Sequence, residues 1–229
     1  MKYNIVLASG SPRRRELMDR IGSSCICIPS NKEEDMSGHD PKVMVEMLSA
    51  MKAEDIANKI ITGTLSQENI TSTGTVAVSY ELKDLIFNLK SASVIIGCDT
   101  VVAFGSSILG KPKDKADAVC MIKSYAGRTH HVHTGVCILV IVNNIIVKKL
   151  NYSVSTGVNV VNMTEKEIVS YVETGEPMDK AGAYAVQGLF CPYVDSIEGD
   201  YYNIVGYPIA SIYKSFKELG IDIVSGNTL

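Results

Sequence analysis

The stretch YNIVLASGSPRRRELM, residues 3–18, joins the pattern of a strand to the pattern of a helix through a tight loop. Residues 3–8 form the short apolar run of a buried strand. Ser9, Gly10 and Ser11 then turn the chain, and Pro12 suits the first helical position, where its fixed φ helps and its missing N–H is not needed. We expect this helix to run to about Ile21. A strand, a short loop and a helix in succession predict an α/β protein.

The same alternation continues along the chain. Residues 25–29 and 93–97 are predicted strands, and residues 40–59, 114–125 and 208–219 are predicted helices. A hairpin is expected to turn at Asn143 and Asn144, and Thr164 with Glu167 forms a capping box for one more helix. Residues 60–92 have no sustained period, so we expect a surface insertion there with one short helix near 80–89. The whole chain, 1–229, is predicted to be one domain.

Composition narrows the class of protein. A chain of 229 residues that is 46% hydrophobic can bury a sizeable core without disulfides. The net charge of −3 argues against a nucleic-acid binder, because such binding depends on many unopposed Lys and Arg side chains. No apolar run approaches the length that spans a membrane, and the N-terminus does not resemble a secretory signal. The six cysteines include no C-x-x-C pair, so we expect reduced, mostly buried thiols in a cytoplasmic protein.

The segment SGSPRRR, residues 9–15, is a candidate phosphate site. Unpaired N–H groups at a helix N-terminus attract anions, and glycine allows a ligand to approach the backbone closely. Arginine adds a fork of donors that matches phosphate oxygens. The alternative is a solvated basic surface, but cations are disfavoured at this end of a helix, which favours a functional role.

The segment GCDTVV, residues 97–102, places Asp99 directly after a predicted buried strand. Ligands bind at the carboxyl ends of strands in open α/β sheets, and a carboxylate there can hold a metal or take a proton from water. An isolated aspartate at a strand end is more often a turn former. Two further loops, LGKPKD at 109–114 and TGEPMDKAGAYAVQG at 174–188, each set a lysine beside glycine or proline. Together these segments suit metal-assisted hydrolysis of a polyphosphate.

Other catalytic motifs are missing from the sequence. It contains neither the G-x-x-x-x-G-K-[ST] loop of P-loop nucleotidases nor the G-x-S-x-G elbow of serine hydrolases. His130, His131 and His133 alternate with other residues in a way that indicates the faces of a strand rather than a metal triad.

Several long motifs, in the same order along the chain, resemble the Maf nucleotide pyrophosphatases. They cover nearly the whole chain except about 60–92, and they read LASGSPRRRELM, GCDTVV, ILGKPKDKADAVCMI, GRTHHVHTGV, YVETGEPMDKAGAYAVQG and GDYYNIVGYP. The resemblance implies an α/β fold of two lobes with a mixed, strongly twisted sheet flanked by helices and a central cleft, related to the inosine triphosphate pyrophosphatases.

The resemblance also implies roles for single residues. Asp99 would be the general base, and Glu34 would join it in binding a divalent cation, Mg²⁺ or Mn²⁺. The expected phosphate-binding residues are Ser9, Arg13, Arg14, Lys52, Lys111 and Lys180.

Substrate preference follows from three positions. Arg13, Thr100 and Gln187 match the branch of the family that acts on dTTP and UTP, whereas the branch acting on 7-methyl-GTP has Trp, Gln and Glu in those places. A glutamine amide both donates and accepts, which suits the edge of uracil or thymine. The resemblance thus implies cleavage of dTTP and UTP to the monophosphate and pyrophosphate, with CTP and modified pyrimidine nucleotides as further candidates.

Three alternatives stay open at this point. A purine pyrophosphatase acting on ITP or XTP would share the fold, a regulator of cell division would bind nucleotide with little catalysis, and a nucleic-acid-binding module disagrees with the net charge. The family often forms dimers, so a homodimer is the expected assembly.

Overall fold

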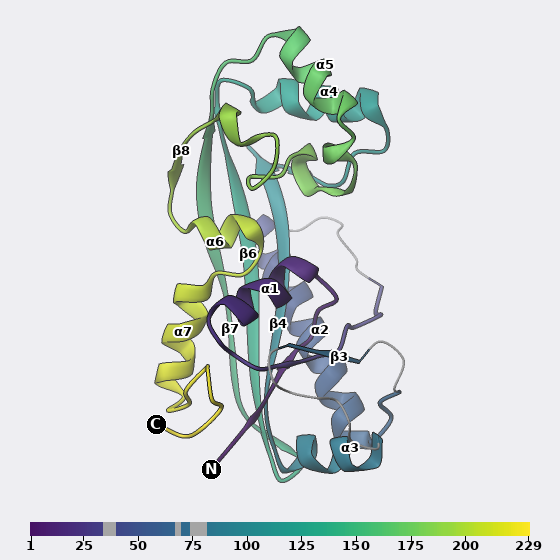
Figure 1. Cartoon of the computed structure of the whole chain (residues 1–229), viewed down its shortest axis with the longest axis vertical. Coiled ribbons are helices and arrows are strands. Elements are labelled where there is room, and N and C mark those ends of the chain that lie inside the picture. The colour runs from purple at the N-terminus through teal and green to yellow at the C-terminus, as the bar shows by residue number, and fades with distance from the viewer. Residues whose placement is uncertain (34–39, 67–69, 74–81) are drawn as a thin grey trace.

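The computed structural model describes residues 1–33, 40–66, 70–73 and 82–229. Three long strands, β4 (Ala92–Phe104), β6 (Thr129–Val142) and β7 (Ile145–Val160), run along most of an elongated body (Figure 1). Most helices fall into an upper and a lower group along the strands, and these groups form the two lobes that the resemblance implied. Each long strand therefore belongs to both lobes.

The sheet is mixed and open. Its order is β3-β2-β1-β4-β6-β7-β8, and β5 pairs with β4 beside this path. The shorter strands are β1 (Asn4–Leu7), β2 (Ile26–Cys27), β3 (Thr71–Ser72), β5 (Ser107–Leu109) and β8 (Val194–Glu198). β1 runs parallel to β2 and β4, and the other pairs are antiparallel. The predicted class, an α/β fold with a mixed sheet flanked by helices, is confirmed.

The lower lobe in Figure 1 has three layers. Helices α1 (Pro12–Arg20) and α7 (Ile209–Glu218) cover one face of the sheet, and α2 (Pro41–Thr62) and α3 (Leu82–Ser91) cover the other. Side chains along β4 alternate between these layers: Ile96 packs in the core with α1 and α7, and Ile95 packs in the core with α2 and α3. β4 and β6 are therefore apolar on both faces in this lobe, whereas β7 exposes polar side chains there, including Lys148 and Lys149.

The upper lobe packs α4 (Lys115–Tyr125), α5 (Glu165–Glu173) and the single turns η1 (Glu176–Asp179), η2 (Ala181–Ala183) and η3 (Cys191–Tyr193) against the far ends of the long strands. Buried aromatic rings fill its core: Tyr125, Tyr171, Tyr184 and Phe190. The short helix α6 (Tyr201–Val205) lies between the lobes. Separate cores thus hold the two lobes on one shared sheet.

Local signals in the sequence are confirmed. Thr164 and Glu167 form the predicted capping box at the start of α5. Asn143 and Asn144 turn the β6–β7 hairpin with φ of 48° and 67°, the left-handed conformation that two-residue hairpin loops need. His130 and His131 lie on opposite faces of β6, one buried and one exposed, as the alternation predicted.

The segment predicted as an insertion contributes to the core where it is described. Its predicted short helix is α3, and its strand β3 pairs antiparallel with β2 at the edge of the sheet. Leu65, Leu85 and Leu89 are buried in the core beneath α2. This segment is therefore integrated into the lower lobe.

The predicted end of the strand at Gly97 is wrong. β4 continues to Phe104, so Asp99 lies within the strand, paired in register with Gly135 of β6. The prediction ended the strand where the apolar run of residues 93–97 ends. The strand continues because β6 pairs with β4 from Ala92 through Ala103 and satisfies its backbone along that length.

All six cysteines are free thiols. Cys25, Cys27, Cys98 and Cys137 are buried, as expected for most of them, and Cys120 and Cys191 are exposed. Among the described helices, none combines the length and the apolar character needed to cross a bilayer.

Candidate active site

The site opens where β4 loses a neighbour. β1 pairs with β4 only as far as Ile96, and β5 begins its pairing at Val102. In the described part of the chain, no strand pairs with β4 between these residues on that side. A cavity of about 530 Å³ lies at this free edge, where the carboxyl end of the parallel strand β1 also points.

Residues from both lobes line the cavity. They are Ser11, Arg13, Arg14, Lys52, Asp99, Thr100, Val102, Lys111, Val132, Asp179, Lys180, Ala181, Tyr184, Ala185, Val186, Gln187, Gly188, Ile204, Val205 and Gly206. The structure thus brings together most of the residues predicted for the site, although they come from distant parts of the sequence. Ser9 lies just behind the lining, and Glu34 lies outside the described residues. The roles assigned to all of them stay predictions.

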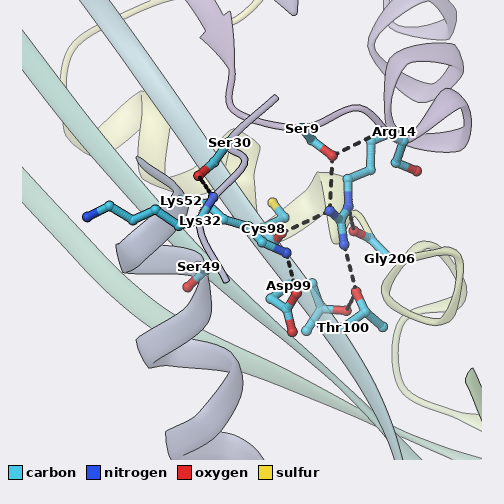
Figure 2. A network of polar contacts seen from close by, with 12 residues as sticks. Ser9, Arg14, Ser30, Lys32, Ser49, Lys52, Cys98, Asp99, Thr100 and Gly206 are labelled. Atoms are coloured by element: carbon cyan, nitrogen blue, oxygen red, sulfur yellow. Dashed lines mark hydrogen bonds and ion pairs between the residues drawn. The ribbon is translucent and has the colours of Figure 1, made fainter. Parts of the chain in front are cut away.

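Lys52 and Asp99 form an ion pair at the centre of the site. The ammonium of Lys52 donates to Asp99 Oδ1 over 2.6 Å, and the two side chains are only 15% and 10% exposed (Figure 2). Little water screens such a pair, so their attraction is stronger than at a surface. Asp99 is therefore held beside a cation on the face of β4 that packs against α2.

Two glycines let α2 approach the sheet closely enough to make this pair. A Cβ on Gly97 would lie 2.2 Å from the carbonyl oxygen of Ser49, and a Cβ on Gly135 would lie 1.9 Å from that of Val45. Both distances are shorter than any real contact of that kind. Only glycine fits at these two strand positions, because the backbone of α2 occupies the space of a side chain.

Arg14 connects three segments of the chain. Its Nε donates to the carbonyl of Gly206 (2.8 Å), Nη1 donates to the carbonyl of Cys98 (2.8 Å) and to Ser9 Oγ (3.1 Å), and Nη2 donates to Thr100 Oγ1 (3.1 Å) (Figure 2). The β1–α1 loop, β4 and the end of α6 are held in place by one guanidinium. Arg14 was predicted to bind phosphate, and in this structure its donors serve acceptors of the protein.

The remaining cationic side chains lie around the opening of the cavity. Lys180 forms an ion pair with Asp179, and its hydrogen bond, aided by the charge of Arg13, holds the pKa of Asp179 below its usual value. Arg13 and Lys111 are exposed residues in the lining. Five Arg and Lys side chains against two carboxylates give the lining a net positive charge, which favours an anionic ligand.

Apolar side chains also line the cavity. Val102, Val132, Ile204 and Val205 line it, together with Tyr184 of the segment that also carries Gln187. The sequence drew attention to the lysine and the glutamine of that segment and missed the tyrosine. The alternation of small and large apolar residues in AGAYAVQG was the signal that could have identified a wall.

Buried groups beside the cavity are unsuited to acid, base or nucleophilic work near neutral pH. Burial raises the pKa of the Cys98 thiol to about 11, so this neighbour of Asp99 stays protonated. Burial lowers the pKa of His130 to about 4, so its imidazole is neutral where it contacts the hydroxyl of Tyr184 at 2.8 Å. Asp99 is left as the pocket carboxylate best placed to accept a proton.

Comparison with known proteins identifies the family of this chain. The family model described as Maf-like protein matches residues 4–219. The chain is 42% identical to the dTTP/UTP pyrophosphatase of Lachnoclostridium phytofermentans over 222 residues, which cover 97% of this chain and 98% of that protein. It is 36% identical to the dTTP/UTP pyrophosphatase of Thermococcus gammatolerans over 221 residues, 96% of this chain and 99% of that protein.

A solved structure also resembles this chain, though slightly. The nucleoside-triphosphatase, or dITP/XTP pyrophosphatase, of Mycobacterium abscessus covers 70% of this chain and 75% of its own, with a TM-score of 0.32 and 10% identity. That likeness is too slight to support an argument. The match of the family model over most of the chain, with relatives of full length, is decisive: the chain belongs to the family of Maf-like proteins.

Proposed function

We propose that this protein hydrolyses dTTP and UTP to the nucleoside monophosphate and pyrophosphate. The observation that carries the proposal is the cavity in which Arg13, Lys52, Lys111 and Lys180 lie around Asp99. The relatives named dTTP/UTP pyrophosphatase, matched over nearly their whole length, support the same reaction. Positive charge beside a carboxylate suits attack of water on a phosphoric anhydride.

The cationic and the apolar side chains of the lining suit the two parts of a nucleotide. We place the triphosphate among the cationic side chains and the base against the apolar side chains Tyr184 and Val186. Gln187 follows Val186 in the sequence and also lines the cavity, where its amide can both donate to and accept from a pyrimidine edge. The same wall is compatible with CTP and with modified pyrimidines.

The proposed chemistry places a water beside Asp99. The carboxylate takes a proton from that water as its oxygen bonds to the α-phosphorus, and the bond from this phosphorus to the bridging oxygen breaks. Pyrophosphate leaves with the electron pair, and Lys111, Lys180 and Arg13 stabilise the charge that it gains. Lys52 neutralises Asp99 before substrate arrives and is drawn toward the phosphates afterwards.

A divalent cation, Mg²⁺ or Mn²⁺, fits the donor chemistry of this site. Asp99 is a hard oxygen ligand in the cavity, and among the described residues no group of three His, Cys, Asp or Glu gathers as a complete cage. Mg²⁺ is usually held by one or two carboxylates together with substrate phosphates, which matches such a site. Asp99, with Glu34 as the resemblance implies, would hold the cation, which supplies positive charge to the phosphate oxygens.

The free thiols suit a reducing compartment, so we place the protein in the cytoplasm as part of the proposal. A homodimer stays the expected assembly, tested by sedimentation or light scattering.

The experiment that tests the function is a panel of nucleotides. Purified protein with Mg²⁺ is incubated with UTP, dTTP, CTP, GTP, ITP and 7-methyl-GTP, and both monophosphate and pyrophosphate are measured. Turnover led by UTP and dTTP supports the proposal. Turnover of ITP alone would support the same type of reaction but overturn the proposed substrate class. Tight binding without turnover would favour a regulator.

A further inference from the structure

A chain of hydrogen bonds leads from the cavity wall into the core through the hydroxyls of Thr100 and Thr134 to the carbonyl of Asn203. Arg14 Nη2 donates to Thr100 Oγ1 over 3.1 Å, Thr100 Oγ1 lies 3.0 Å from Thr134 Oγ1, and Thr134 Oγ1 lies 3.0 Å from the carbonyl oxygen of Asn203. Thr134 is in β6, in strand register with Thr100 of β4, so the two side chains share one face of the sheet. The line of contacts runs from the cavity into the core.

The direction of each hydrogen bond in this line is fixed. A carbonyl oxygen can only accept, so Thr134 gives its single hydroxyl proton to Asn203. The contact between the two threonines then needs the proton of Thr100. Any other arrangement would leave two lone pairs facing each other at 3.0 Å in the interior, which is costly.

The hydrogen bond from Thr134 to Asn203 is held in a fixed place. Thr134 and Asn203 are fully buried. The side-chain amide of Asn203 donates to the carbonyl of Val132 and to Thr156 Oγ1, both at 3.0 Å, which anchors α6 against β6. The acceptor that receives the proton of Thr134 is therefore held rigidly.

We propose that Thr134 is a positioning residue for base selection, because it accepts the hydrogen bond that Thr100 donates and leaves Thr100 able only to accept hydrogen bonds from a ligand in the cavity. Uracil and thymine carry an N–H at position 3, which donates to such an acceptor. Cytosine has no hydrogen on N3, so the lone pair of this nitrogen would face the lone pair of Thr100 and the two would repel each other. This selection of a donor-bearing base rests on the proposed function and adds a reason for preferring UTP to CTP.

The first test replaces Thr134 by valine, which has nearly the same shape and cannot accept a hydrogen bond from Thr100. The hydroxyl of Thr100 still accepts from Arg14, but its proton is no longer directed to Thr134 and can be donated to cytosine. The ratio of kcat/KM for UTP to that for CTP should fall about tenfold, the effect of one unfavourable polar contact. Thr134→Ser keeps the hydroxyl and should keep the wild-type ratio. An unchanged ratio in a folded Thr134→Val protein would overturn the proposal, because general damage lowers both substrates together.

A second test uses the wild-type protein, so it can be carried out even if Thr134→Val does not fold. UTP methylated at N3 lacks the donor, so the wild-type protein should use it about tenfold less well than UTP. Equal use of the two would overturn the proposal. If the wild-type protein hydrolyses no triphosphate, the proposed function fails. The inference about Thr134 is then tested by the dissociation constants of UMP, CMP and N3-methyl-UMP. Weaker binding of both CMP and N3-methyl-UMP supports it, and equal binding of the three refutes it.

Discussion

Lys52 donates to Asp99 over 2.6 Å, although 47 residues separate them and they belong to a helix and a strand. The contact exists because Gly97 and Gly135 allow α2 to lie directly on the sheet. A triphosphate brought into the cavity competes with Asp99 for the ammonium of Lys52. Substrate binding and release of the carboxylate are thereby coupled in the proposed reaction.

Asp99→Asn should abolish catalysis while substrate binding is largely kept. Asparagine has the same shape but takes no proton from water, and loss of a general base lowers kcat by about 10² to 10⁴. Single-turnover assays with UTP, together with calorimetric binding of UMP, separate the two effects. Asp195→Asn, at an exposed position on β8, is the matched control and should behave as wild type. Near-normal turnover by Asp99→Asn would refute the assignment.

Gly135→Ala should damage both stability and activity. The added methyl would lie 1.9 Å from the carbonyl oxygen of Val45, so α2 must move away from β6 and carry Lys52 from Asp99. Overpacking of this kind costs about 1–3 kcal/mol of the free energy of unfolding. Urea denaturation measures it. Gly157→Ala on β7 is the control, since its nearest contacts would be an ordinary 3.5 Å. Equal stability of the two variants would mean that the close approach of α2 is not required.

Arg14→Lys should destabilise the protein even without substrate. Lysine keeps the charge but cannot reach Gly206, Cys98 and Thr100 together, so buried acceptors lose their donor. We expect a loss of about 2–4 kcal/mol in the free energy of unfolding. Arg20→Lys is the control, because Arg20 pairs only at the surface with Glu16 and should change stability by less than about 0.5 kcal/mol.

The same variant distinguishes two roles for Arg14. If Arg14 binds phosphate directly, pyrophosphate should inhibit Arg14→Lys more weakly than wild type while stability hardly changes. A loss of stability with unchanged inhibition by pyrophosphate supports the structural role shown by the hydrogen bonds.

Gln187→Glu should reduce the preference for UTP and dTTP. The carboxylate can only accept, so it loses the hydrogen bond that an amide donates to a pyrimidine carbonyl, and it adds negative charge near the triphosphate. We expect kcat/KM for UTP to fall about tenfold or more relative to that for GTP. Gln187→Met removes the hydrogen bonds without the charge and separates the two causes. Unchanged selectivity in both variants would exclude Gln187 from base recognition.

Much of the fold could be predicted from local patterns. The apolar periods placed the helices that became α1, α2, α4 and α7 to within a few residues, and the Asn143–Asn144 turn and the cap at Thr164 were visible as local chemistry. Such signals depend only on neighbouring residues. The length of β4 was underestimated because its continuation past Asp99 depends on pairing with a distant strand, β6.

In the site, too, local motifs were predictable and contacts between distant residues were not. Arg13, Lys111, Lys180 and Gln187 were selected as residue types in recognisable motifs, and all four line the cavity. The partners of those residues were not predictable, because a sequence does not show which acceptors a guanidinium will reach. Thr134 is an example: its type is unremarkable in a strand, and only the contacts with Thr100 and the carbonyl of Asn203 give it a role.

His130 should make the protein less stable in mild acid. Its pKa is about 4 in the folded state because burial disfavours the charged ring, while the unfolded chain has the ordinary value near 6.5. The unfolded state therefore binds the proton first as the pH falls, and stability is lost from about pH 6.5 down to about pH 4, by about 3 kcal/mol in total. The comparison with a variant isolates the titration of His130 from that of other groups. His130→Gln removes this titration and should flatten the dependence of the free energy of unfolding on pH by up to one proton. His131→Gln, at an exposed position on the same strand, should keep the wild-type slope. Equal slopes in all three proteins would show that protonation of His130 does not cause the loss of stability in mild acid.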